Sequence, residues 1–299
     1  MKVNDKALIQ SHREILHECE TFNKNLYSSK VQVNDHPEVF FPPTREVLSE
    51  ERRQHCEGLL SPKECLEALN SMATEKTPGT DGLPCEFYKV FWKDIDETIT
   101  EVLNVSYQTG KLAVSQRRGI VKLIPKRDAD PNLIKNWRLL TLLNCDYKIA
   151  SQAIANRIKV VLPELISEDQ LGFIKNRCIS DNIRTLDSAF KYVDSKGLPG
   201  LLLFLDFKKA FDTLERLFIN QPFRHFGFGP SLLNWVELYY CNTESCILNN
   251  GWESNFFELS RGVRQGCPLS PYLFIQSVEI LAEAIRNKKK NNNKGHQNL

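Results

Sequence analysis

The feature that most constrains the fold is a run of apolar residues, Leu201 to Leu205, that ends in an aspartate, Asp206. An unbroken apolar run of this length predicts a strand buried on both faces of a sheet. A carboxylate there is costly unless a metal ion or another partner compensates its charge. Mg²⁺ prefers carboxylate oxygens and needs few protein ligands when substrate phosphates supply the others. Asp206 is therefore a candidate metal ligand, with a simple turn or helix cap as the alternative.

The charge of the chain is nearly balanced but unevenly distributed. Its 299 residues contain 39 Lys and Arg against 37 Asp and Glu, so the net charge says little about partners. Between Arg117 and Arg138, however, basic residues clearly outnumber acidic ones. Such a segment is suited to holding phosphates, and a solvated surface is the alternative interpretation.

Several classes of site and location are disfavoured by the motifs that are missing. The nine cysteines form no CxxC pair and the six histidines form no HExxH motif, which argues against a zinc site. No apolar run approaches the roughly 20 residues of a membrane span. The first residues do not resemble a secretory signal, so we expect an intracellular protein of the cytoplasm or nucleus.

Periodicity and turn residues predict a helix-rich α+β fold. A capping box at Ser61–Glu64 predicts a helix start, and Asn250-Gly251 predicts a hairpin turn. Residues 36–44, with three prolines, are expected to form a linker, and the Lys- and Asn-rich tail 287–294 is expected to be disordered. Helices are predicted over residues 5–29, 61–72, 87–95, 149–161, 182–193, 231–240 and 269–286, and strands over 119–125, 201–207, 246–250 and 255–260.

Six sequence blocks follow one another in order across residues 76–271. They are Lys76-Thr-Pro-Gly-Thr-Asp-Gly-Leu-Pro84, Val121-Lys-Leu-Ile-Pro-Lys126, Asn136-Trp-Arg-Leu-Leu-Thr-Leu-Leu-Asn144, Asp169-Gln-Leu-Gly-Phe-Ile-Lys-Asn-Arg177, Phe204-Leu-Asp-Phe-Lys-Lys-Ala-Phe-Asp212 and Gly262-Val-Arg-Gln-Gly-Cys-Pro-Leu-Ser-Pro271. Any one block is modest evidence, but their order is specific. Together they resemble the reverse transcriptases of LINE-type (non-LTR) retrotransposons.

This resemblance implies a right-hand polymerase fold and template-directed nucleotidyl transfer. The partners implied are an RNA template, a DNA primer and deoxynucleoside triphosphates, and the oligomeric state stays open. The expected organisation is an N-terminal helix and linker (1–45), fingers (46–198), a partial palm without a thumb (199–286) and a disordered basic tail (287–299). Two Mg²⁺ ions, about 3.5–4 Å apart, would activate the attacking oxygen and stabilise the leaving one.

The resemblance also assigns roles to individual residues. Asp206 would be the catalytic carboxylate and would bind metal together with the backbone carbonyl of Phe207. Phe211 occupies the steric-gate position, where an aromatic ring would crowd a 2′-hydroxyl, with core packing as the alternative. The remaining nucleotide contacts implied are Lys122, Arg138, Gln265 and Gly266. The implied nucleic-acid contacts are Gln170, Arg177 and Arg127, for which an ordinary surface position is equally open.

One departure from the family bears on activity. No Tyr/Phe-x-Asp-Asp motif follows residue 212, although the family has one soon after the Gln265-Gly266 block. We therefore expect a C-terminally truncated fragment that lacks polymerase activity, because a lone carboxylate holds two Mg²⁺ ions poorly. The alternatives are a non-enzymatic remnant that binds RNA and, with less support from the motifs, a nuclease that uses Asp206 and Asp212.

Overall fold

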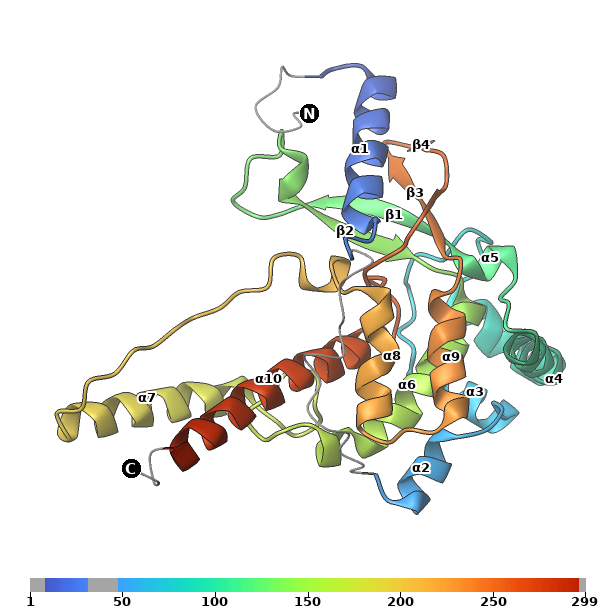
Figure 1. The fold of residues 1–299 in the computed structure, drawn as a ribbon. Coiled ribbons are helices and arrows are strands. Elements are labelled where there is room, and N and C mark those ends of the chain that lie inside the picture. Colours follow the sequence, from blue (N-terminus) through green and yellow to red (C-terminus); the bar gives the residue numbers. More distant parts are fainter. Residues whose placement is uncertain (1–8, 32–47, 296–299) are drawn as a thin grey trace.

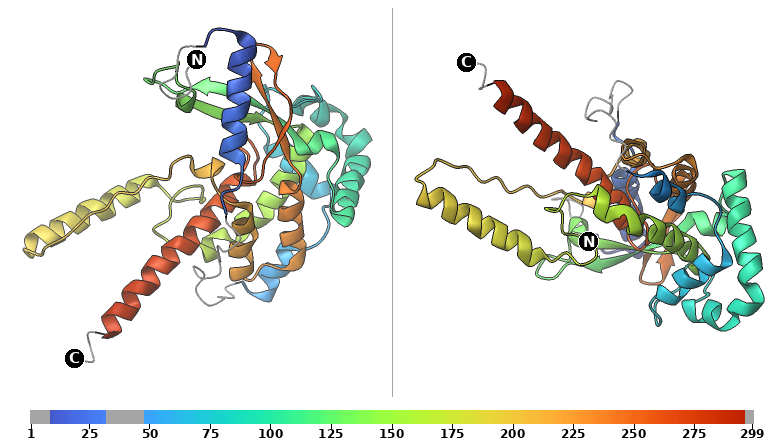
Figure 2. Two further views of the ribbon diagram at one scale, coloured as in Figure 1. Left: turned by 45° about the horizontal axis from the view of Figure 1, so that its top comes forward. Right: turned by 90° about the horizontal axis from the view of Figure 1, so that it is seen from below.

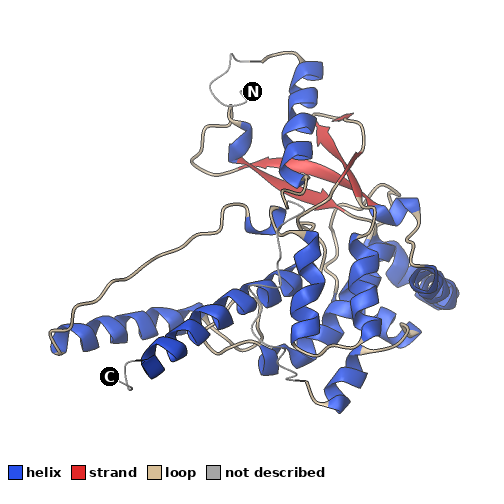
Figure 3. Cartoon of the chain, in the orientation of Figure 1, coloured by secondary structure: helices blue, strands red, loops and turns tan. Residues whose placement is uncertain are grey.

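Helices make up most of the described molecule, and most of them lie to one side of a single small sheet (Figure 1). The computed structural model describes residues 9–31 and 48–295 (Figures 1 and 3), so the linker predicted at residues 36–44 lies outside the described part. The helices are α1 (His12–Tyr27), α2 (Glu50–Cys56), α3 (Pro62–Ser71), α4 (Cys85–Thr109), α5 (Val114–Arg117), α6 (Cys145–Leu165), α7 (Ile179–Ser195), α8 (Arg216–His225), α9 (Pro230–Tyr240) and α10 (Ser270–Gly295). Two short 3₁₀ turns, Ile134–Asn136 and Ala210–Asp212, complete the helical elements of the described chain. This is the helix-rich α+β architecture that the sequence predicts.

The sheet is mixed, with the strand order β2-β1-β3-β4, and β5 also pairs with β3. The strands are β1 (Arg118–Pro125), β2 (Trp137–Leu142), β3 (Glu244–Asn249), β4 (Trp252–Glu253) and β5 (Phe257–Glu258). β1 runs antiparallel to β2 and parallel to β3, so segments far apart in the sequence share the sheet. Helix α1 lies across one face of the sheet (Figure 1). Its apolar side packs with the alternate residues of β1 that point to that face, such as Val121 and Leu123.

The turn between β3 and β4 confirms the hairpin prediction. Asn250 and Gly251 both have positive φ angles, 50° and 83°, as a two-residue type I′ turn requires. Asn249 pairs with Trp252 across the turn. The capping box at the start of α3 is also confirmed, since the Ser61 hydroxyl accepts a hydrogen bond from the Glu64 backbone and the Glu64 carboxylate accepts one from Ser61 N–H.

Helix α6 forms the centre of the larger core, where α3, α4, α9 and α10 pack against it. It continues through Pro163 to Leu165, so the predicted end of this helix at residue 161 was wrong. Pro163 cannot donate a hydrogen bond to the carbonyl of Lys159, but both residues are exposed. Water can therefore satisfy that carbonyl, and the cost of the proline is reduced.

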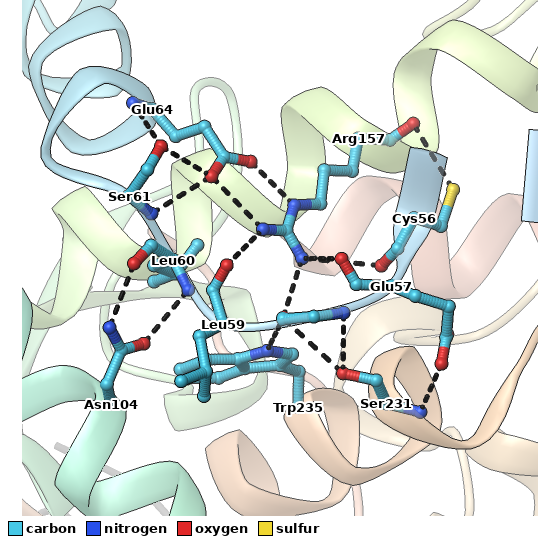
Figure 4. Close-up of polar contacts among 11 residues, drawn as sticks. Cys56, Glu57, Leu59, Leu60, Ser61, Glu64, Asn104, Arg157, Ser231 and Trp235 are labelled. Carbon is cyan, nitrogen blue, oxygen red and sulfur yellow. Dashed lines mark hydrogen bonds and ion pairs between the residues drawn. The ribbon is translucent and has the colours of Figure 1, made fainter. Parts of the chain in front are cut away.

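A buried arginine joins α6 to the chain segment between α2 and α3 (Figure 4). The Arg157 guanidinium donates to the backbone carbonyls of Cys56, Glu57, Gly58 and Leu59 and forms a two-armed ion pair with Glu64 at 2.7 and 3.1 Å. Burial alone would raise the pKa of Glu64, but hydrogen bonds from Arg157 and Ser61 lower it overall. The planar fork of arginine suits this arrangement, in which every donor finds an oxygen.

Helix α7 and the segment that follows it form an arm that projects from the rest of the molecule (Figure 2). None of the described α7 side chains is buried. Residues 201–207 are extended but belong to no strand, and Leu203, Phe204 and Leu205 are 70%, 76% and 72% exposed. The prediction of a buried strand here was wrong. An apolar run becomes a strand only when neighbouring strands supply backbone partners, and none of the described strands pairs with it.

Helix α10 also differs from the expectation. It continues to Gly295, so the prediction of disorder over residues 287–294 was wrong where the backbone is described. Lysine has a high helix propensity, and adding residues to an existing helix avoids the cost of starting a new one.

Candidate nucleotide and nucleic-acid site

The free face of the β1–β2 hairpin carries two of the predicted nucleotide contacts. Lys122 pairs with Leu140, and Arg138 pairs with Ile124, in the antiparallel register. Side chains of directly opposed residues lie on the same face, so Lys122 and Arg138 are diagonal neighbours. Both are exposed, while the opposite face is covered by α1. Arg127 lies in the exposed turn that follows β1, beyond this pair.

The loop 262–267 is anchored beside this hairpin. The Thr141 N–H of β2 donates to the carbonyl of Gln265 at 2.9 Å. Gly266 has a φ of 117°, and a Cβ at this position would lie 2.5 Å from the Thr141 carbonyl oxygen, so only glycine fits here. The buried Arg264 guanidinium donates to the backbone carbonyl of Arg117 and lies 5.4 Å from the ring centre of Tyr147. The loop is therefore held from both sides.

A buried carboxylate connects this loop to the end of the Asp206 block. Asp212 accepts hydrogen bonds from the Gln265 side-chain amide at 2.9 Å and from the Tyr27 hydroxyl at 3.0 Å. Burial raises the pKa of Asp212, although these two hydrogen bonds and the charges of Lys209 and Lys126 act in the opposite direction. Burial and the same Asp212 charge raise the pKa of Tyr27. Asp212 thus has a structural role, which makes a nuclease centre formed with Asp206 a poor fit.

Phe211 is partly buried within a group of aromatic rings. Its ring stacks on Phe274 at a centroid distance of 5.0 Å and meets the edge of Phe173 at 6.4 Å. Its carbonyl accepts a hydrogen bond from Val263 N–H at 2.7 Å, which keeps it close to the 262–267 loop. Packing therefore accounts for much of its position, as the alternative interpretation expected.

Asp206 and Phe207 lie at the inner end of the projecting arm. Asp206 is exposed, and Phe207 is half-exposed with its ring 6.2 Å from that of Phe274. Within residues 9–31 and 48–295, no three His, Cys, Asp or Glu side chains gather where they could hold a metal ion. The donor set present around Asp206 therefore does not fit a two-metal centre.

Gln170 and Arg177 belong to the loop between α6 and α7. The Arg177 guanidinium donates to the carbonyls of Ser167, Gln170 and Ile166, the last two at 2.7 and 3.0 Å. Arg177 thus closes its own loop, and the Gln170 backbone is one of the oxygens that it holds. Phe173 of the same loop reaches Phe211, so the loop borders the aromatic group.

Comparison with known proteins identifies the family. Residues 124–296, more than half of the chain, match the model of "Reverse transcriptase (RNA-dependent DNA polymerase)". The chain belongs to the reverse transcriptases of non-LTR retrotransposons. It is 36% identical over 234 residues to the "Transposon TX1 uncharacterized 149 kDa protein" of Xenopus laevis, which covers 78% of this chain and 18% of that protein. It is 25% identical over 251 residues to the Pol polyprotein of the type-2 retrotransposable element R2DM of Drosophila melanogaster, covering 79% of this chain and 23% of the relative.

A third relative agrees with this assignment. The "Putative 115 kDa protein in type-1 retrotransposable element R1DM" of Drosophila melanogaster is 28% identical over 223 residues, or 74% of this chain and 21% of that protein. This reverse transcriptase chain therefore spans about a fifth of the length of these relatives. Across the described ranges, no helix combines the length and apolar character needed to cross a membrane.

Two contacts of this reverse transcriptase were not anticipated from its motifs. Tyr27 reaches Asp212 from the N-terminal helix, and no local pattern around Tyr27 signals that partner. Gly79, in the first block, packs so closely on α6 that a Cβ there would lie 2.0 Å from the Asn144 side chain and 2.4 Å from its backbone nitrogen. The density of Gly and Pro in the first block was the available sign of such a close approach.

Proposed function

We propose that the chain supplies the fingers and part of the palm of an RNA-directed DNA polymerase, and that it binds template, primer and nucleotide at the β1–β2 hairpin. The observation that carries the proposal is the shared free face of Lys122 and Arg138 beside the anchored Gln265–Gly266 loop. The fingers would correspond to residues 46–198 and the palm portion to residues 199–286. The family match supports the reaction class.

Lys122 and Arg138 are suited to the triphosphate of the incoming nucleotide. A lysine ammonium attracts phosphate as a point charge, whereas an arginine fork can hold two phosphate oxygens at once. Their exposure on a rigid pair of strands leaves them free for a ligand without further rearrangement. Arg127, in the adjoining turn, would meet the nucleic-acid backbone.

The sugar and base would lie toward Gln265, Gly266 and Phe211. Gly266 lets a ligand approach the backbone closely because it has no side chain. The ring of Phe211 would exclude a 2′-hydroxyl and so select deoxynucleotides. Its stacking on Phe274 supports this role, because a gate that is fixed by packing keeps its distance from the sugar. Gln170 and Arg177 would border the template through the loop that Arg177 closes.

The divalent metals of the family reaction are not accounted for by the described residues alone. Asp206 and the Phe207 carbonyl are the expected ligands, but Asp206 is exposed and no acidic cluster surrounds it. The chain also has no Tyr/Phe-x-Asp-Asp motif after residue 212. We therefore propose that this polypeptide by itself binds substrates without extending a primer. This feature favours the second candidate, an RNA-binding protein without catalytic activity.

Nucleotide and RNA titrations would separate the two candidates. We expect a fluorescent deoxynucleoside triphosphate to bind the wild-type chain and Lys122→Ala or Arg138→Ala to weaken that binding by about tenfold or more, as for loss of a charge-assisted hydrogen bond. Lys63→Ala, an exposed change on α3, is the matched control and should have no effect. Salt-dependent RNA binding without nucleotide binding would support the RNA-binding candidate instead. Primer extension that Asp206→Ala abolishes would contradict the proposed inactivity.

A further inference from the structure

The buried carboxylate of Asp212 joins two parts of the chain that are remote in sequence. One of its oxygens, Oδ1, accepts both the Tyr27 hydroxyl at 3.0 Å and the Gln265 amide nitrogen at 2.9 Å. Tyr27 and Asp212 are each only 4% exposed. A hydrogen bond in such a site is protected from competition by water, and the loss of one partner is correspondingly costly.

The backbone around this network is fixed as well. The Tyr27 carbonyl, at the end of α1, accepts from Ser260 N–H at 3.0 Å and from Arg261 N–H at 2.9 Å. Arg261 Nε also donates to the Leu26 carbonyl at 2.7 Å. These contacts hold the end of α1 against residues 260 and 261, which lead from β5 into the 262–267 loop. These backbone hydrogen bonds therefore hold the Tyr27 hydroxyl beside Asp212.

The chemistry of the carboxylate decides which way the Gln265 amide points. An ionised carboxylate only accepts hydrogen bonds, so the amide must turn its NH₂ group toward Asp212. The Gln265 carbonyl oxygen, Oε1, then faces away from Asp212 and is the group left for a ligand. Without the Tyr27 hydroxyl, the carboxylate loses one of the two donors that fix it and the amide loses its fixed acceptor.

We infer that Tyr27 is a positioning residue. Acting through Asp212, it sets the orientation of the Gln265 side-chain amide, so that the side-chain oxygen Oε1 faces the nucleotide. The N-terminal helix would thereby belong to the nucleotide site without touching the ligand. This inference rests on the proposed role of Gln265 as a nucleotide contact. It assigns no role to Tyr27 in the binding of the triphosphate, which lies with Lys122 and Arg138.

The test compares Tyr27→Phe with Tyr107→Phe. The Tyr107 hydroxyl donates to Ser231 at 3.0 Å, remote from Gln265, so both variants lose one hydroxyl and one hydrogen bond. Two ligands are titrated, a deoxynucleoside triphosphate and inorganic tripolyphosphate. We expect Tyr27→Phe to weaken nucleotide binding by about two- to tenfold and to leave tripolyphosphate binding unchanged. Tyr107→Phe should change neither.

An NMR readout separates this inference from the proposed function. The NMR resonance of the ¹⁵N-labelled Gln265 side-chain amide can be assigned by its loss in Gln265→Leu. Its chemical shift should change in Tyr27→Phe and be unchanged in Tyr107→Phe. An unshifted Gln265 amide in Tyr27→Phe, or an equal loss of affinity for both ligands, would overturn the inference. If the wild-type chain binds no nucleotide, the proposed function fails, while the amide signal still decides whether Tyr27 orients Gln265.

Discussion

The 262–267 loop and the 201–207 segment carry equally recognisable motifs, but they are supported in opposite ways. The loop is joined to β2 through Thr141, to the end of α5 through Arg264 and to α1 through Asp212 and Tyr27. The segment is extended and exposed, and it follows a helix with no buried side chain. Local sequence therefore does not decide which motif is packed against the rest of the chain. The difference lies in the partners that the rest of the chain provides.

The largest expected loss of stability follows from replacing the buried Arg157. Arg157→Leu should lower the free energy of unfolding by about 3–5 kcal/mol, because it removes the buried charge that pairs with Glu64 and the donor to four backbone carbonyls. Arg184→Leu, on exposed α7, should change it by less than about 0.5 kcal/mol. Urea unfolding followed by circular dichroism would measure both. Similar losses in the two variants would show that the arm contributes to the same core.

A smaller loss of unfolding free energy is expected at the contact between the Lys76–Pro84 block and the start of α6. Gly79→Ala should destabilise the protein by about 1–3 kcal/mol, since the added Cβ would overlap the Asn144 backbone and side chain. Gly172→Ala is the matched control, because the space around that Cβ is open and its φ is not positive. Thermal unfolding of the two variants gives the comparison, and an unchanged Gly79→Ala midpoint would mean that the loop moves freely from α6.

The third prediction concerns the pH dependence of the anchored loop. Burial raises the pKa of Asp212 in the folded state, so the folded protein binds this proton more tightly than the unfolded chain. The resulting stabilisation is complete below the unfolded pKa and is lost as the pH rises through the folded pKa. Between these pH values, the unfolding free energy of the wild type should therefore fall relative to that of Asp212→Asn.

The control for this measurement is a buried polar residue that does not titrate. Thr100→Val should shift the unfolding free energy by the same amount at every pH. Parallel pH profiles for wild type and Asp212→Asn would contradict the raised pKa. They would also weaken the contrast between a buried 262–267 loop and an exposed 201–207 segment.

The smallest effect is expected within the exposed segment itself. Leu205→Ser should alter the free energy of unfolding by less than about 0.5 kcal/mol, because the side chain is already in water. Leu273→Ala, in the buried part of α10, should cost about 2–5 kcal/mol in the same denaturant titration. A cost for Leu205→Ser that approaches that of Leu273→Ala would show that residues 201–207 pack against another part of the chain.

The sequence predicted most of the elements whose cause is local. The capping box of Ser61 and Glu64 and the Asn250-Gly251 turn depend on neighbouring residues, and both were confirmed. The family, the mixed α+β class and the strand that contains Lys122 were also predicted correctly.

The features that were not predicted depend on contacts between residues that are far apart in the sequence. The apolar run Leu201 to Leu205 predicts a strand, but a strand forms only where neighbouring strands pair with it. The parallel pairing of Arg118 with Glu244 and the bond from Tyr27 to Asp212 each join residues more than a hundred positions apart. The assigned roles of Asp206, Lys122, Arg138 and the other site residues remain predictions for the experiments above.

The contact between Tyr27 and Ser260 also sets the order in which the protein can be assembled during its synthesis. These residues are 233 positions apart, so at about 5–20 residues per second the N-terminal helix waits roughly 10–50 s for its partner. Until then its apolar face can cover only β1 and β2, since β3 and β5 have not been made. A chaperone that shields exposed apolar surface would have its longest opportunity at this helix, which is made well before the β3 and β5 strands that help to bury it.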